Sequence, residues 1–219
     1  MPDIRLENVS SFYKNKKETN YIYKDISLTF SNASFNVILG PSGQGKTTLL
    51  RTILGAVNYT GNVYFDDVLT DKISTKDLKI SYVSQEYGLY PHMTIFNNIA
   101  FPLKNAGANR EEIESRVMEI ANVLDIQACL SRKPRHISGG QAQRVALAKA
   151  LIKNPKVLLL DEPLSNVDPK IKEQIIPYLK KVQTLFGITV IYVTHDKNEA
   201  IALGDFIYQL DDDGLKKIK

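Results

Sequence analysis

The chain has little of several features that would place it in a specialised class. It contains one cysteine, Cys129, so neither an internal disulfide nor a cysteine-based metal cluster can form within it. No apolar run approaches the ~18 residues of a membrane-spanning helix, and the first residues, MPDIRLENVSSFYKN, lack the apolar core of a signal peptide. We therefore expect a soluble, cytoplasmic protein with a structural thiol, whose role at a membrane would come through a partner.

A large excess of charge of one sign is also missing. The 219 residues include 28 Lys and Arg against 24 Asp and Glu, and the basic residues are scattered along the chain. This distribution gives little support to nucleic-acid binding. With 43% hydrophobic and 24% charged residues and no low-complexity tract, the chain should fold as one domain, or as one domain with a small inserted lobe.

Four short apolar runs precede polar residues of interest. The runs are FNVILG before the first glycine loop, ISYVSQ ending at Gln85, VLLLDE ending at Glu162 and ITVIYVTH ending at His195. Continuous β-rich runs are typical of parallel strands buried on both faces. Helical patterns lie between them, for example the apolar stripe of Ile113, Val117, Ile120 and Leu124. Strands that alternate with helices predict an α/β core with functional groups at the carboxyl ends of the strands.

Two regions fall outside this alternation. Residues 3–30 and about 60–70 should form short antiparallel strands in a small flanking sheet, with turns at Thr60-Gly61-Asn62 and Asp66-Asp67. Residues of about 92–152 are mainly helical in pattern and would form an inserted helical lobe. We therefore expect a single domain over residues 1–219. Because no internal repeat is present, each motif occurs once per chain.

A glycine-rich segment, GPSGQGKT, matches the pattern G-x-x-x-x-G-K-[ST] between a predicted strand and the helix-like run TTLLRTIL. Its glycines let backbone N–H groups point at phosphates, while Lys46 neutralises their charge and the Thr47 hydroxyl can ligate magnesium. A glycine-rich turn with a solvent-facing lysine is the alternative, but the flanking strand and helix favour phosphate binding. The predicted phosphate-binding residues are Gly40, Pro41, Ser42, Gly43, Gln44, Gly45, Lys46, Thr47 and Thr48.

Two carboxylates, Asp161 and Glu162, end the run VLLLDE. Beside a phosphate loop, Asp161 would hold magnesium through water, and Glu162 would orient or deprotonate an attacking water. The same pair could instead simply open a turn at Pro163. The complete phosphate loop elsewhere in the chain favours the catalytic interpretation.

A third motif, SGGQ at residues 138–141, introduces the helix-like segment AQRVALAKALIK. Ser138 and Gln141 stand at the spacing of a capping box. Gly139 and Gly140 would allow a phosphate to approach the backbone closely, and the partial positive charge of a helix amino end would favour the γ-phosphate. Capping and anion binding are compatible here.

The ordered set GPSGQGKT, Gln85, SGGQ, LLLDEP, SNVD and His195 resembles the nucleotide-binding subunits of ABC transporters over essentially the whole chain. The resemblance implies a P-loop ATPase fold, in which a RecA-like parallel sheet carries an antiparallel β subdomain and an inserted helical signature subdomain. It implies ATP and Mg²⁺ as ligands. It also implies that two subunits pack head to tail, with ATP between the phosphate loop of one and the SGGQ of the other, as a homodimer or beside a similar subunit.

The resemblance also implies roles for two isolated residues in the first half of the chain. Tyr13 would stack on adenine, although Phe12, Tyr21 and Tyr23 are nearby aromatics that could equally be core residues. Gln85 would meet both magnesium and the attacking water. Without the resemblance, an amide in this position would be an unremarkable exposed side chain.

In the second half, the resemblance implies that His195 hydrogen-bonds the γ-phosphate and helps to position water. Asp168, within SNVDPK, matches the loop that communicates between the two subunits, and it could also cap the next helix with Pro169 at its first position. Pro177 should kink that helix or end its first half.

The segment after Gln85, EYGLYPHMTIFNNIAFPLK, is similar to ATPase subunits of importers for sugars and related small solutes. In that family the segment receives a short helix of a membrane subunit, so Tyr87, Leu89, Tyr90 and Phe96 would be exposed in a groove. The resemblance implies partner permease subunits, a solute-binding protein as a further partner, and a peripheral location on the inner face of the cell membrane. Many such subunits carry a carboxyl-terminal regulatory domain, which we do not expect in this chain, so the solute stays open.

We therefore expect an ATP hydrolase that powers solute import. A different class remains open, namely a soluble ABC-type ATPase that drives a cytoplasmic assembly such as iron–sulfur cluster building. A noncatalytic nucleotide sensor would be expected to lack Glu162 or His195, and both are present.

Overall fold

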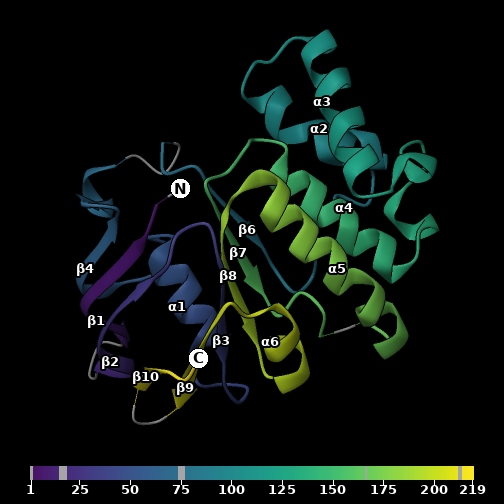
Figure 1. Ribbon diagram of the computed structural model, residues 1–219. Helices are drawn as coiled ribbons and strands as arrows, with labels where there is room; N and C mark the ends of the chain where they lie inside the picture. The colour runs from purple at the N-terminus through teal and green to yellow at the C-terminus, as the bar shows by residue number, and fades with distance from the viewer. Residues whose placement is uncertain (1, 15–18, 74–76, 166, 212–213) are drawn as a thin grey trace.

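Two β-sheets run through the computed structural model, which describes residues 2–14, 19–73, 77–165, 167–211 and 214–219 (Figure 1). The strands are β1 Ile4–Lys14, β2 Thr19–Phe30, β3 Phe35–Leu39, β4 Tyr59–Phe65, β5 Val68–Leu69, β6 Ile80–Val83, β7 Val157–Asp161, β8 Thr189–Thr194, β9 Phe206–Asp211 and β10 Gly214–Lys217. The larger sheet has the order β10-β9-β3-β8-β7-β6, and the smaller has the order β2-β1-β4-β5.

The four apolar runs form parallel strands of the larger sheet, as predicted: β3 pairs with β8, β8 with β7 and β7 with β6. Every residue of β3, β7 and β8 is buried, which confirms burial on both faces. That prediction is wrong for β6, of which only Val83 is buried. β6 is an edge strand, so no neighbouring strand covers its outer side.

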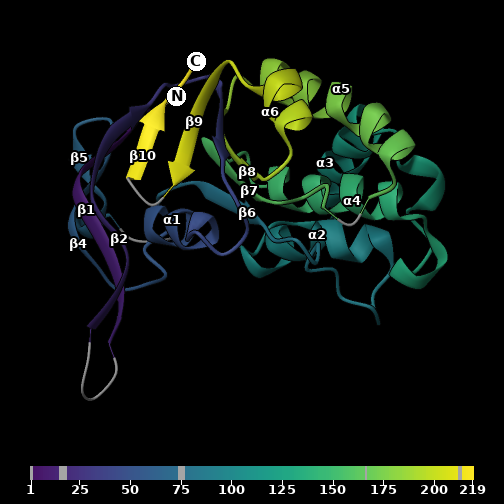
Figure 2. The ribbon, with the colours of Figure 1, turned by 90° about the horizontal axis from the view of Figure 1, so that it is seen from below.

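Helices cover both faces of the larger sheet. They are α1 Lys46–Ile53, α2 Ile95–Asn105, α3 Arg110–Val123, α4 Gly139–Leu151, α5 Pro169–Phe186 and α6 Lys197–Leu203. Side chains alternate along each strand, so Val190 and Tyr192 of β8 join a core with α2–α6, whereas Ile191 and Val193 join a core with α1 and the smaller sheet. Figure 2 shows α1 between the smaller sheet and the parallel strands.

The region between α2 and α4 is mainly helical, as its pattern indicates, and α4 packs against α2, α3 and β6. The apolar stripe predicted on α3 and its end is buried, as is Cys129, whose thiol donates to the carbonyl oxygen of Ile126 at 3.1 Å. Single turns of 3-10 helix lie at Thr70–Lys72, Gln127–Cys129 and Pro134–His136. None of the helices in the described ranges is long and apolar enough to cross a membrane.

The smaller sheet is antiparallel, as predicted, but its turns only partly match the sequence signals. The Asp66-Asp67 turn is present between β4 and β5, with Asp66 at φ +51°. Thr60-Gly61-Asn62 is not a turn; it lies inside β4 opposite a register shift of β1 between Glu7 and Ser10. Gly61 has φ +88°, and a Cβ atom there would collide with the carbonyl oxygen of Asn8. Gly61 therefore lies at a β-bulge, which needs the same backbone freedom as a turn.

Helix α5 begins as expected and continues past Pro177. Asp168 caps it by accepting a hydrogen bond from the backbone N–H of Lys170 at 2.9 Å, with Pro169 in the first turn. The helix does not end at Pro177 but runs on to Phe186. A buried face that includes Ile175, Leu179 and Val182 holds both halves against the core and offsets the lost N–H.

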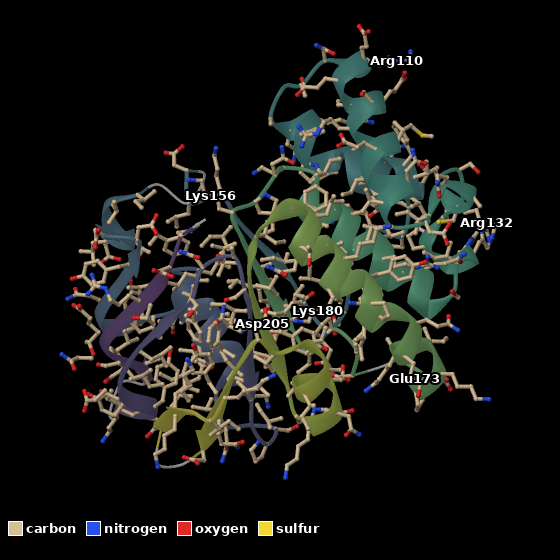
Figure 3. The ribbon with its side chains drawn as sticks, in the orientation of Figure 1. Arg110, Arg132, Lys156, Glu173, Lys180 and Asp205 are labelled. Atoms are coloured by element: carbon tan, nitrogen blue, oxygen red, sulfur yellow. The ribbon has the colours of Figure 1, made fainter. Side chains whose placement is uncertain are left out.

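An ion pair links α5 to the larger sheet. Lys180 and Asp205, both labelled in Figure 3, come from α5 and from the turn before β9, and their Nζ and Oδ1 atoms lie 2.9 Å apart. The other oxygen of Asp205 accepts from the N–H of Phe35 at 2.7 Å. Burial alone would raise the pKa of Asp205, but hydrogen bonds from Lys180 and Phe35 lower it below its usual range.

Candidate active site

The glycine-rich loop lies between the buried strand β3 and α1, as its sequence predicts. Gly43 and Gly45 have φ values of +87° and +88°, a region that L-residues rarely adopt. Gly45 is also the N-cap residue of α1 and offers no side-chain cap. The first N–H groups of α1 are therefore left to hydrogen-bond a ligand, and the helix dipole favours an anion there.

Lys46 bends back over this loop. Its side chain is 3% exposed, and Nζ donates to the carbonyl oxygen of Pro41 at 2.8 Å and lies 3.2 Å from Oε1 of Glu162. The lysine is therefore held inside the site rather than in solvent. This placement excludes the alternative of a glycine-rich turn with a solvent-facing lysine.

The two carboxylates at the end of β7 face different partners. Oδ1 of Asp161 accepts from the Thr47 hydroxyl at 2.8 Å, and Oδ2 accepts from the Tyr82 hydroxyl at 2.7 Å. Glu162 has φ +43°, and its Oε2 lies 3.0 Å from Nδ1 of His195. Such a backbone conformation costs a non-glycine residue about 1–3 kcal/mol and is frequent at functional sites. It places the carboxylate between Lys46 and His195.

A cavity of about 450 Å³ lies over the loop, and nine of the predicted site residues line it. Tyr13 is 56% exposed at this cavity, whereas Tyr23 is 7% exposed and bonds Thr52 in the core. Tyr21 lines a neighbouring cavity instead. The lining residues of the loop cavity are Tyr13, Ile22, Ser42, Gly43, Gly45, Lys46, Thr47, Thr48, Gln85 and Glu162.

SGGQ forms the predicted capping box at the start of α4. The Ser138 hydroxyl accepts from the N–H of Gln141 at 3.3 Å, and the Gln141 side chain accepts from the N–H of Ser138 at 3.1 Å. Among the described residues that line the loop cavity, none comes from 138–141. Ser138 and Gly140 instead line a separate cavity of about 430 Å³ between α4 and α5. One chain thus does not bring SGGQ to its own phosphate loop.

The segment after Gln85 differs from its prediction. Gln85 itself is exposed at the cavity, but Tyr87, Leu89, Tyr90 and Phe96 are half-buried rather than exposed. Tyr87, Leu89 and Phe96 pack against the core on the α2–α6 face of the larger sheet. A hollow of about 290 Å³ remains beside β6 and α4. Asp168 is exposed at the start of α5, and Asn166 of the SNVD motif lies outside the described residues.

Sequence reasoning missed Tyr82 and a buried acid, Glu199. Glu199 is 4% exposed and accepts from Tyr192, Thr194 and Lys172. Burial, the nearby Glu199 carboxylate and the hydrogen bond to it raise the pKa of Tyr192 well above its usual range. The signal for Tyr82 is the strand register: Tyr82 pairs with Leu159, so its side chain shares a face with Asp161 two residues on.

The oxygen donors at the loop fit a magnesium ion that is bound together with a nucleotide. Thr47 and Asp161 are in contact, and Gln85 lines the same cavity. Within the described ranges, no cluster of three or more His, Cys, Asp or Glu side chains could hold a metal by itself. Magnesium commonly uses one or two protein oxygen groups with substrate phosphates and water. This donor set therefore suits a cation that arrives with phosphates.

A mainly parallel sheet, a glycine-rich loop before a helix and carboxylates at the end of a nearby strand define an α/β P-loop nucleoside-triphosphatase fold. The sequence profile of the ABC transporter family matches residues 23–165, and the chain belongs to that family.

Curated relatives are ATP-binding proteins of importers. The chain is 47% identical to the trehalose/maltose import ATP-binding protein MalK of Thermococcus litoralis over 84% of this chain and 51% of that protein. It is 42% identical to an sn-glycerol-3-phosphate import ATP-binding protein, UgpC, of Rhodopseudomonas palustris over 94% of this chain and 56% of that protein. It is 44% identical to the glucose import ATP-binding protein GlcV of Saccharolobus solfataricus, over 94% of this chain and 59% of that protein. The chain thus spans between half and three fifths of the length of these relatives.

Solved structures agree with the fold. The dimeric structure of the bacterial ABC transporter cassette MJ0796 superimposes with a TM-score of 0.84 at 35% identity and covers 99% of both chains. A second dimeric structure of that cassette, in a post-hydrolysis state bound to ADP and Pi, gives the same TM-score at 34% identity and 99% coverage of both chains.

Proposed function

We propose that this chain binds and hydrolyses ATP as one half of a dimer, and that the cycle powers import of a small solute through a membrane permease. One observation carries the proposal: Glu162 lies between Lys46 and His195, at 3.2 Å and 3.0 Å, at the cavity over the phosphate loop. This arrangement places a candidate base between a cation for the γ-phosphate and a histidine that can position water.

Each residue of the site has its own role in ATP binding or hydrolysis. The loop N–H groups and Lys46 bind the phosphates of ATP, and Tyr13 stacks on the adenine. Glu162 accepts the proton of the attacking water, and His195 holds both Glu162 and the γ-phosphate in place. When bound, magnesium neutralises charge that develops on the phosphate oxygens, with Thr47, Asp161 and Gln85 as its protein partners.

Lys46 also links binding to activation. Its ammonium lies 3.2 Å from Oε1 of Glu162. A γ-phosphate competes with Glu162 for that ammonium, because the phosphate carries more negative charge. The exchange frees the Glu162 carboxylate to bind water. Nucleotide binding would therefore both fill the site and release its base.

We further propose that a second cassette completes the site. SGGQ lies at a helix amino end but lines a different cavity from the phosphate loop of its own chain. A head-to-tail partner would supply its own Ser138–Gln141 to the γ-phosphate, and Asp168 would lie at the contact between the two chains. The dimeric form of the related cassette MJ0796 supports the pairing of two such chains.

The names of the relatives support the transport role. They are import ATP-binding proteins for trehalose or maltose, sn-glycerol-3-phosphate and glucose. We propose that permease subunits hold this chain at the inner face of the membrane, and that a solute-binding protein delivers a small polar solute. These relatives do not favour the alternative of a cytoplasmic assembly ATPase.

Purified protein tests the ATPase proposal. Lys46→Ala should weaken ATP binding by roughly tenfold or more, because the phosphates lose their buried cation. Lys104→Ala is the matched control, because Lys104 is an exposed α2 residue whose ammonium donates to the Asn97 side chain at 2.8 Å. Unchanged affinity in Lys46→Ala, measured by equilibrium titration, would refute the phosphate-loop assignment.

Native membranes test the transport proposal. The tagged chain should be recovered from gently solubilised membranes together with a multi-span permease, identified by mass spectrometry. Lys46→Ala should be recovered with the same permease, because that residue lies in the nucleotide cavity rather than at the hollow beside β6. Recovery of soluble partners alone, with none in the membrane fraction, would favour a cytoplasmic assembly instead.

A further inference from the structure

Asp161 is held at both carboxylate oxygens by hydroxyl groups from two different elements. Thr47 at the start of α1 donates to Oδ1 at 2.8 Å, and Tyr82 of β6 donates to Oδ2 at 2.7 Å. Asp161 is 6% exposed, so little water can take the place of either donor. Two fixed donors leave the carboxylate one orientation about its Cβ–Cγ bond.

Tyr82 reaches Asp161 because of sheet register. β6 and β7 are parallel neighbours, with Tyr82 opposite Leu159. Leu159 and the ring of Tyr82 belong to the core on the α1 side, and Asp161 follows Leu159 by two residues, so it points to the same face. The phenol is long enough to extend from the edge strand to the end of its neighbour, where the carboxylate lies.

We propose that Tyr82 is a positioning residue for the divalent cation: its hydroxyl holds Oδ2 of Asp161 and thereby presents Oδ1, the oxygen next to Thr47, to the nucleotide cavity. This inference rests on the proposed function, because it takes Asp161 as the residue that meets magnesium. Tyr82 itself touches neither nucleotide nor metal in this assignment. It acts through the carboxylate.

Two effects of the Tyr82 hydroxyl oppose one another. A hydrogen bond withdraws negative charge from the carboxylate and so weakens its attraction for a cation. The same bond fixes the orientation of Asp161, and loss of such outer partners typically costs about 10–100-fold in metal affinity. Because the donor is on Oδ2 and the cavity side is Oδ1, most of the withdrawn charge is on the far oxygen. Orientation should therefore dominate.

The test is the gain in nucleotide affinity that magnesium provides. A fluorescent ATP analogue is titrated into the full chain in excess Mg²⁺ and again in EDTA. Tyr82→Phe keeps the ring and removes only the hydroxyl. We expect its affinity in EDTA to match that of the unaltered chain, while the ratio of the two affinities falls by about tenfold.

Tyr208→Phe is the matched control. The Tyr208 hydroxyl is buried on β9 and donates to the carbonyl oxygen of Thr29 at 3.1 Å, away from the loop cavity. This variant should keep the full magnesium gain although it loses a hydrogen bond of a similar kind. Equal losses of affinity with and without magnesium in Tyr82→Phe would indicate a general structural role and would overturn the inference.

Asp161→Asn separates this inference from the proposed function. If the unaltered chain does not bind the analogue, the assignment of the nucleotide site itself fails. If Asp161→Asn keeps the magnesium gain, the assignment of Asp161 as the residue that meets magnesium fails. If Asp161→Asn removes the gain and Tyr82→Phe retains it, only the role of Tyr82 fails. Loss of the gain in both variants, with unchanged binding in EDTA, supports the inference.

Discussion

Lys46 and Glu162 face each other across the candidate site, with Nζ and Oε1 3.2 Å apart in a pair whose side chains are 3% and 18% exposed. The proposed phosphate-binding cation therefore lies within ion-pair distance of the candidate base. A carboxylate so placed competes with ATP for the lysine, and its removal should have opposite effects on binding and on turnover.

Glu162→Gln tests this relationship. The amide keeps the shape but loses both the charge and the basicity, so ATP should bind at least as tightly, while turnover should fall by about 10²–10⁴-fold. Binding is measured with a fluorescent nucleotide and turnover by phosphate release. Glu114→Gln, at an exposed position on α3, is the control and should change neither quantity. Near-normal hydrolysis in Glu162→Gln would exclude Glu162 as the base.

Gly139 and Gly140 are adjacent in SGGQ but should respond differently to an added methyl group. A Cβ atom on Gly140 would lie 2.7 Å from Cγ2 of Ile171 on α5, whereas one on Gly139 would meet nothing within 4 Å. Gly140→Ala should therefore destabilise the isolated chain by about 1–3 kcal/mol through overpacking. Gly139→Ala should leave stability unchanged.

The same pair tests the composite site. If Gly139 approaches the nucleotide held by a second chain, Gly139→Ala should abolish ATP-dependent dimerisation in a Glu162→Gln background without lowering the melting temperature. Light scattering reports the dimer, and thermal melting reports the fold. Normal dimerisation of the Gly139→Ala protein would count against SGGQ as a phosphate contact between chains.

Motifs whose geometry is set by neighbouring residues were predictable from the sequence. The capping box of Ser138 and Gln141 spans four residues, and the phosphate loop owes its shape to its own glycines and to the helix that follows. Burial of three core strands was also predictable, because their apolar runs have no polar alternation. In each case the cause and the result lie within one short segment.

Contacts between distant segments were not predictable in this way. Tyr82 and Asp161 are 79 residues apart, and their bond depends on the order and register of β6 and β7. The sequence did not indicate that β6 is an edge strand, nor that Gly61 lies in a bulge rather than a turn. The same limit explains why Tyr87 was expected to be exposed: its burial depends on packing of the helical region against the core.

Glu199 and Lys172 form a partly buried ion pair between α6 and α5, with Nζ and Oε1 2.7 Å apart. The other oxygen of Glu199 accepts from the hydroxyls of Tyr192 and Thr194. The carboxylate therefore connects α5, α6 and the end of β8 that precedes His195. Lys172→Met should leave that charge without its cation and destabilise the chain by about 2–4 kcal/mol, less than for a fully unsatisfied charge because the hydroxyls remain.

The double variant separates charge from packing at this pair. Lys172→Met with Glu199→Gln should recover part of the lost stability, because no unpaired charge is then buried. Chemical denaturation of the two single variants and the double variant gives the coupling energy. Strict additivity of the three free-energy changes would show that the pair contributes no interaction of its own.

Alkaline pH should destabilise the fold through its buried tyrosines. Burial raises the pKa of Tyr23, Tyr82 and Tyr208 to about 12, against about 10 in an unfolded chain. The folded protein therefore keeps protons that the unfolded chain releases, so this contribution to stability is complete below pH ~10 and is lost between pH ~10 and ~12.

The melting temperature should be nearly constant from pH ~7 to ~9 and fall steeply above pH ~10, in step with tyrosinate absorbance. Tyr208→Phe should make the fall shallower because phenylalanine cannot ionise, whereas Tyr13→Phe, at an exposed position, should leave it unchanged. Identical slopes in all three proteins would mean that tyrosine burial does not set the alkaline limit.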